Sequence, residues 1–166
     1  MFKEMRVAGL TVDPFTNMPI IILKDMEDKS AVPIWIGLLE ASAIATELEK
    51  IQLPRPMTHD LLKNILDNFK VDVMKVEVND LQDNTFYATL YLKMGNKKYA
   101  IDCRPSDAIA IALRTNSPIY VSEEVIARSR RIDLKGATMG KEGKEPEKWA
   151  EILENMSPED FGKYKM

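Results

Sequence analysis

The residues best suited to chemistry stand in one polar segment at 102–107, which reads DCRPSD. Asp102 and Asp107 could hold a divalent cation, because the few protein ligands of Mg²⁺ are typically carboxylates. Arg104 has the planar guanidinium that binds phosphate well, and Ser106 stands nearby. A metal-bound water would suit the hydrolysis of a phosphodiester. The segment therefore predicts catalytic and metal-binding roles for the two aspartates, and substrate-binding roles for Arg104 and Ser106.

The same segment has an ordinary structural interpretation, because capping residues outnumber catalytic ones at helix starts. Ser106 or Asp107 could cap a helix that begins at Pro105. Arg104 could simply pair with Asp102. In either case a helix N-terminus exposes unpaired N–H groups and a partial positive charge, which attract an anion. The spacing alone leaves both interpretations open.

Two glutamates form a second candidate group. Glu40 and Glu47 lie seven residues apart, on one face of a predicted helix, where two carboxylates can share a cation or divide acid and base roles. For Glu47 the solvated side of an amphipathic helix is the favoured interpretation. Glu40 remains a catalytic candidate, because it follows the strand end at Gly37.

The third candidate group lies at 55–60, which reads RPMTHD. His59 is the only histidine, so any imidazole base must be this residue, and Arg55 is assigned to substrate binding. His59 and Asp60 are equally ordinary in a first helical turn, where the helix dipole favours an acidic residue. Cys103 lies on an apolar strand phase, which favours a buried structural thiol over a nucleophile.

The hydrophobic pattern predicts the elements that position these groups. Strands are predicted at 3–13, 18–25, 31–36, 71–79, 85–94, 97–102 and 119–121, with a bulge near Val73, and helices at 38–51, 58–69, 105–114 and from Ser122 to near Arg130. On the second helix the residues expected to face inward are Leu61, Leu62, Ile65, Leu66 and Phe69. A gapless match of Ile34–Leu48 with Tyr99–Leu113 indicates a possible duplication of a β-β-β-α unit, which chance similarity between Ala-rich helices could also produce. The fold class predicted is α+β, with antiparallel β meanders and packed helices.

Length and composition fit one globular domain with a separate tail. The 166 residues are 45% hydrophobic and 30% charged, as in ordinary globular proteins. Residues 1–131 are predicted to form the domain. Residues 132–166 are predicted to form a linker and a helical tail, whose apolar stripe would pack on its own domain or on a partner chain. That stripe consists of Trp149, Ile152, Leu153 and Met156.

Several functional classes are disfavoured by the sequence. No run approaches the roughly 20 apolar residues that span a bilayer, and the N-terminus lacks the apolar core of a signal peptide, so no membrane partner is expected. A single cysteine favours a reducing compartment, which predicts a cytoplasmic location. Glycine-rich phosphate loops and zinc-type spacings are absent. The net charge of −3 indicates that any contact with phosphate uses a local patch or a bound cation.

Three separated motifs resemble the bifunctional nuclease domain family. They read PIWIG at 33–37 with EA at 40–41, RPMTHDL at 55–61, and DCRPSDAIA at 102–110. Their order and spacing match over about residues 5–130. The resemblance implies a nuclease that acts on DNA and RNA, an unusual α+β fold, and association into dimers or larger assemblies.

Nucleic acid would then be a transient substrate of a homo-oligomer. With the aspartates described above, the expected cofactor is Mg²⁺ or Mn²⁺. The resemblance brings no set of catalytic residues, so the assigned roles rest on residue chemistry. The alternative is a non-catalytic oligomeric binding or regulatory module, which the acidic composition favours.

Overall fold

A computed structural model describes the backbone of residues 1–136 and side chains as far as Ser129. The strands are β1 (Phe2–Val12), β2 (Pro19–Asp25), β3 (Ala31–Trp35), β4 (Val71–Gln82), β5 (Thr85–Met94), β6 (Lys97–Cys103) and β7 (Ile119–Ser122). The helices are α1 (Leu38–Leu48), α2 (Thr58–Asn68), α3 (Pro105–Thr115) and α4 (Glu123–Gly136). The predicted linker, the tail helices and the Trp149 stripe lie largely outside these residues, so the boundary at 131 stays a prediction.

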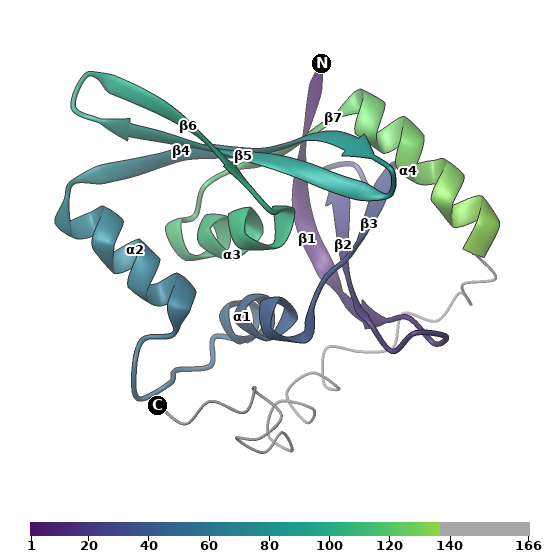
Figure 1. Cartoon of the computed structure of the whole chain (residues 1–166), viewed down its shortest axis with the longest axis horizontal. Helices are drawn as coiled ribbons and strands as arrows, with labels where there is room; N and C mark the ends of the chain where they lie inside the picture. The colour runs from purple at the N-terminus through teal and green to yellow at the C-terminus, as the bar shows by residue number, and fades with distance from the viewer. Residues whose placement is uncertain (137–166) are drawn as a thin grey trace.

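One mixed sheet organises the described residues (Figure 1). Its strand order is β3-β2-β1-β7-β4-β5-β6. The meanders β1-β2-β3 and β4-β5-β6 are both antiparallel. β7 joins them, antiparallel to β1 and parallel to β4. The predicted α+β class with antiparallel meanders is confirmed, and the parallel β4–β7 pair is an addition. The order β-β-β-α occurs twice, but this order does not test common origin, so duplication stays a prediction.

The helices cover the sheet unequally. α1 and α3 pack against each other below the sheet in Figure 1, α2 lies beside α3, and α4 packs against β4, β3 and β7. α3 is the most buried helix, as its all-apolar centre predicts, with Ile109 and Ala110 fully enclosed. No helix of the described chain is long and apolar enough to cross a membrane.

The predicted inward face of α2 is wrong. No α2 residue is buried, and the helix exposes a row of large apolar side chains. The exposed fractions are 54% for Leu61, 38% for Leu62, 44% for Ile65 and, just past the helix, 70% for Phe69. A helix at the margin of a domain can have an apolar face that no other part of the domain covers. The sequence pattern shows that the face exists but not whether it is covered.

One local irregularity falls where the sequence places it, and others do not. The register of β4 against β5 shifts between Val73 and Lys75, which confirms the predicted bulge. α1 ends at Leu48 instead of Ile51, because Lys50 adopts a left-handed conformation with φ of 54°. α3 begins at Pro105, whose fixed φ suits the first helical turn. That start places Arg104 at the junction between β6 and α3.

Candidate active site

Arg104 connects two helices at this junction. Its Nη1 donates to Glu40 Oε1 at 2.8 Å, and its Nε donates to Asp107 Oδ2 at 2.9 Å. Glu40 lies in the first turn of α1 and Asp107 in the first turn of α3. The arginine therefore pairs with these two carboxylates. The structural interpretation of the segment expected a pair with Asp102, which does not form. No side chain caps the start of α3.

His59 completes the cluster from a third helix. Its Nε2 lies 2.9 Å from Asp107 Oδ1, and its side chain is 13% exposed. When Nε2 carries the proton, it donates to the carboxylate, and Nδ1 is left as the acceptor. A carboxylate that fixes the tautomer of a histidine in this way is a recurring device of general-base catalysis. We call Glu40, His59, Arg104 and Asp107 the α3 cluster.

The electrostatics of the cluster keep Asp107 ionised. Burial by itself would raise the pKa of its carboxyl, but hydrogen bonds from Arg104 and His59, together with their charges, outweigh burial and lower that pKa. The pKa of Arg104 is raised, mainly by its hydrogen bond to Asp107 and then by Glu40. At neutral pH Asp107 therefore acts as a hydrogen-bond acceptor, and His59 is the group suited to move a proton.

A second arginine, Arg114, supports the cluster from the end of α3, and the sequence analysis assigns it no role. The side chain of Arg114 is 3% exposed, and its Nε donates to Asp60 Oδ1 at 2.7 Å. The two other guanidinium nitrogens each donate to a backbone carbonyl at 3.0 Å, that of Ala110 in α3 and that of Ala43 in α1. One buried side chain thus ties together α1, α2 and α3. Its only signal in the sequence is a basic residue at the end of an apolar helix.

Asp60 links this support to His59. Its second oxygen accepts from the backbone N–H of Met57 at 2.9 Å, at the start of α2. Burial opposes ionisation of Asp60, but this bond and the bond from Arg114 outweigh it and lower the pKa of the carboxyl. Because His59 is the neighbouring residue, Arg114 and Asp60 fix the turn of α2 that carries the imidazole.

Gly37 gives Glu40 the space to reach Arg104. The glycine precedes α1 in an ordinary extended conformation, with φ of −74°. A Cβ added there would lie 2.2 Å from Glu40 Oε2, because the carboxylate folds back over the glycine. Any side chain at this position would force the Glu40 carboxylate to move.

Gly37→Ala is therefore expected to uncouple Glu40 from Arg104 while leaving the free energy of unfolding nearly unchanged, since only a flexible side chain must shift. Its effect on nucleic-acid cleavage should match that of Glu40→Gln. Gly9→Ala is the matched control, because a Cβ there meets no atom within 4 Å. Rates on a fluorescent oligonucleotide and thermal unfolding would check this. Wild-type cleavage by Gly37→Ala beside an impaired Glu40→Gln would contradict it.

The remaining predicted site residues lie outside the α3 cluster. Asp102 is exposed on β6 opposite Thr89, and strand alternation directs it away from the side of Cys103. Ser106 is 5% exposed in the first turn of α3, and Arg55 is exposed before α2. None of these three side chains makes a hydrogen bond or ion pair with a residue that the structure describes. Their assigned roles stay predictions.

The expected metal site can be compared with the donors present. Residues 1–129 contain no group of three or more His, Cys, Asp or Glu side chains placed to hold a metal ion. Glu40 and Asp107 are the two carboxylates that face one guanidinium, that of Arg104. Two carboxylates together with substrate phosphate can suffice for Mg²⁺. Both carboxylates are already paired with Arg104, and the metal site stays a prediction.

Cys103 is suited to a structural role. Burial, followed by the charges of Asp102 and Asp107, raises the pKa of its thiol to about 11. At neutral pH the sulfur therefore stays protonated, and a thiol is a poor nucleophile. Its side chain packs against the core.

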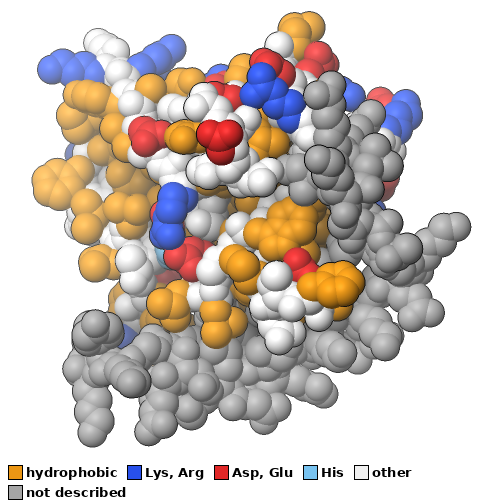
Figure 2. Space-filling model, turned by 45° about the vertical axis from the view of Figure 1, so that its right-hand side comes forward, with side chains coloured by type: hydrophobic (Ala, Val, Ile, Leu, Met, Phe, Trp, Pro, Cys, Tyr) orange, Lys and Arg blue, Asp and Glu red, His pale blue; other side chains and the backbone are white. Residues whose placement is uncertain are grey.

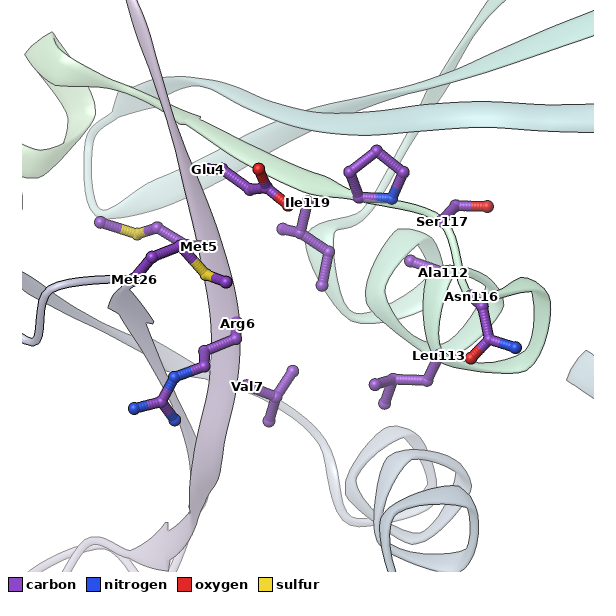
Figure 3. Close-up of a pocket in the computed structure, with 11 residues that line it drawn as sticks. Glu4, Met5, Arg6, Val7, Met26, Ala112, Leu113, Asn116, Ser117 and Ile119 are labelled. Carbon is purple, nitrogen blue, oxygen red and sulfur yellow. The ribbon is translucent and has the colours of Figure 1, made fainter.

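A hollow of about 510 Å³ lies at the other end of α3 (Figure 3). It opens between β1 and the turn from α3 to β7, with Arg6, Leu113 and Asn116 in its wall. Arg6 already pairs with Asp28 at 2.7 Å. None of the residues of the α3 cluster lines this hollow, so the shape and the chemistry point to different places. Arg104 of the α3 cluster is 65% exposed, so a polymer could reach it without a pocket that encloses the substrate.

Comparison with known proteins identifies the family of this chain. A family model described as the bifunctional nuclease domain matches residues 21–133. The uncharacterized protein Rv1829 of Mycobacterium tuberculosis is 39% identical over 163 residues, 95% of this chain and 97% of that protein. Bifunctional nuclease 1 of Oryza sativa and that of Arabidopsis thaliana are each 34% identical over 110 residues, 63% of this chain but only 33% and 34% of the plant proteins. The chain therefore belongs to the bifunctional nuclease domain family, as a bacterial-type member.

Proposed function

We propose that this protein is a nuclease that hydrolyses phosphodiester bonds of DNA, RNA or both at the α3 cluster. One observation carries the proposal: Asp107 accepts hydrogen bonds from both Arg104 and the only histidine. The names of the plant relatives support the same activity. Nucleic acid would be a transient substrate, consistent with the net charge of −3.

Each residue of the cluster has a distinct task in this proposal. The side chain of Arg104 is 65% exposed, so its outer N–H groups can donate to phosphate oxygens. His59, oriented by Asp107, takes a proton from the attacking water at Nδ1. The water oxygen bonds to phosphorus, the ester P–O bond breaks, and the leaving oxygen takes up a proton from solvent water. Glu40 holds Arg104 in place until the substrate binds.

A divalent cation, Mg²⁺ or Mn²⁺, is part of the proposal. Asp107 and Glu40 would hold it together with phosphate oxygens, and Asp102 would need a different strand-end conformation to join them. When bound, it would supply positive charge for the oxygen atoms around phosphorus. No residue task described above depends on it.

The alternative is a non-catalytic oligomeric binding or regulatory module. The observation that favours it is the charge balance of the cluster, because Arg104 is already neutralised by Glu40 and Asp107. In that case the four residues would only join α1, α2 and α3. The two functions differ in a single measurable property, cleavage.

The test compares the full chain with His59→Ala, both purified by one procedure, on labelled single-stranded DNA and RNA. Each substrate is incubated with Mg²⁺, with Mn²⁺ and with EDTA. Cleavage by the wild type that falls at least tenfold in the variant is expected, because a positioned general base contributes about 10²–10⁴-fold. Equal rates would identify a contaminating nuclease and favour the binding module. Cleavage in the presence of EDTA would contradict the role of the cation and leave the proposed roles of the four residues unchanged.

A further inference from the structure

The two edges of the sheet differ sharply. β3 forms one edge, and it contains Pro33, which cannot donate a backbone hydrogen bond. Its central residues are buried, and α4 packs against it. β6 forms the other edge, and every residue from Lys97 to Asp102 is exposed. Proteins usually protect such an edge with proline, a bulge, a covering element or charged side chains. Of these, β6 has only its charged residues, Lys97, Lys98 and Asp102, within the described chain.

The sequence of β6 is complementary to itself. In an antiparallel pair of two β6 strands with a twofold axis at Ala100, Lys98 of each copy faces Asp102 of the other. On the opposite side of the strands, Tyr99 faces Ile101. The first pair therefore joins opposite charges, and the second joins two apolar side chains. A shift by one residue would place Lys98 opposite Ile101 and lose both matches.

The apolar side of β6 continues onto α2. Tyr99 and Ile101 are 39% and 44% exposed, on the same side of β6 as Cys103, which packs against the core. α2 ends near the turn between β5 and β6, and its own apolar row has no partner among the described residues (Figure 1). Hydrophobic side chains gather on the left of the view in Figure 2. A second copy seated on β6 would cover part of this surface.

We propose that two copies of this chain associate through β6 strands, antiparallel about a twofold axis at Ala100, so that their sheets become continuous. An interface of this kind is isologous, because the same patch serves both copies. The proposal goes beyond nuclease activity and does not depend on it. It assigns Asp102, which lies outside the α3 cluster, to an ion pair with Lys98 of the second copy.

A charge exchange tests the register. Lys98→Asp and Asp102→Lys each place like charges opposite one another in two symmetric pairs, so each is expected to weaken dimerisation about tenfold or more. The double variant, Lys98→Asp with Asp102→Lys, restores both ion pairs and should recover the wild-type dissociation constant. Sedimentation of the full chain would measure all four proteins. Lys29→Asp, on the β2–β3 turn, is the control and should dimerise normally.

A crosslink provides a second measurement that does not depend on charge. Facing Cα atoms in antiparallel strands lie about 4.5–5.5 Å apart, within the range of a disulfide. Ala100→Cys in a Cys103→Ala background should form a covalent dimer under mild oxidation, whereas Lys29→Cys in that background should not. A monomeric wild type, equal dimerisation of all charge variants, or no crosslink at position 100 would each overturn the proposal.

Discussion

Asp107→Asn is expected to lower the rate of nucleic-acid cleavage by about 10²-fold or more, the contribution of a positioned general base. Asp107 accepts hydrogen bonds from both His59 and Arg104. An amide at this position carries no negative charge, and its nitrogen can donate to the imidazole and select the wrong tautomer. Single-turnover rates on labelled DNA and RNA would measure the loss.

The same change should leave the fold intact. The two ion pairs of Asp107 involve partly exposed groups, so their loss is expected to cost about 1 kcal/mol of unfolding free energy. Asp67→Asn is the matched control, because it removes the Lys63–Asp67 pair on the outside of α2. It should retain full activity. Full activity in Asp107→Asn would remove the α3 cluster from the proposed active site.

The pH dependence of stability checks the assignment independently of activity. The carboxyl of Asp107 has an ordinary pKa of 3.8, and in the folded chain this pKa is lowered. Its stabilising contribution is therefore fully present above pH 4 and is lost as pH falls through the lower, folded value. The difference in unfolding free energy between wild type and Asp107→Asn should shrink below about pH 4. A difference that grows on acidification would contradict the lowered pKa.

Arg114→Met is expected to have the largest effect on stability, about 3 kcal/mol of unfolding free energy. The change removes a guanidinium that is 3% exposed, together with its three hydrogen bonds to Asp60 Oδ1 and to the carbonyls of Ala43 and Ala110. Methionine keeps much of the volume, so the loss reports mainly on the missing hydrogen bonds. Thermal unfolding should shift down by roughly 6–12 °C for a domain of this size.

Cleavage should fall together with stability in this variant, because the α2 turn that carries His59 loses its anchor. Asp60→Asn, which keeps the oxygen that accepts from Arg114, should have a smaller effect on both properties. Arg128→Met is the control, since Arg128 is 44% exposed and its loss should cost less than about 1 kcal/mol. A wild-type melting temperature in Arg114→Met would show that hydrophobic contacts can replace the arginine.

Much of the fold could be read from local patterns. Alternation with period two located the strands, the phase change at Val73 marked a real bulge, and the apolar run after Pro105 marked the most buried helix. These features follow from short-range rules, in which each residue reports on its neighbours two to four positions away. The same rules failed for α2, where an apolar face exists but nothing inside the described domain covers it.

The candidate site was only partly predictable. Glu40, His59 and Asp107 were chosen by residue type, and the structure brings these three together while leaving Asp102 on the open side of β6. Arg104 and Glu40 are 64 positions apart, so their pairing depends on how α1 packs against α3. Sequence spacing contains no such information.

The sequence by itself therefore determined the elements, the family motifs and the residue types at the start of α3. Tertiary structure decided which of those residues meet, that Arg114 is a buried support, and that β6 is an open edge. The physical reason is the sequence separation over which each kind of interaction acts. Backbone propensity and hydrophobic period act within a few residues, whereas ion pairs, burial and strand order are set by contacts between distant segments, which exist only after the chain has packed.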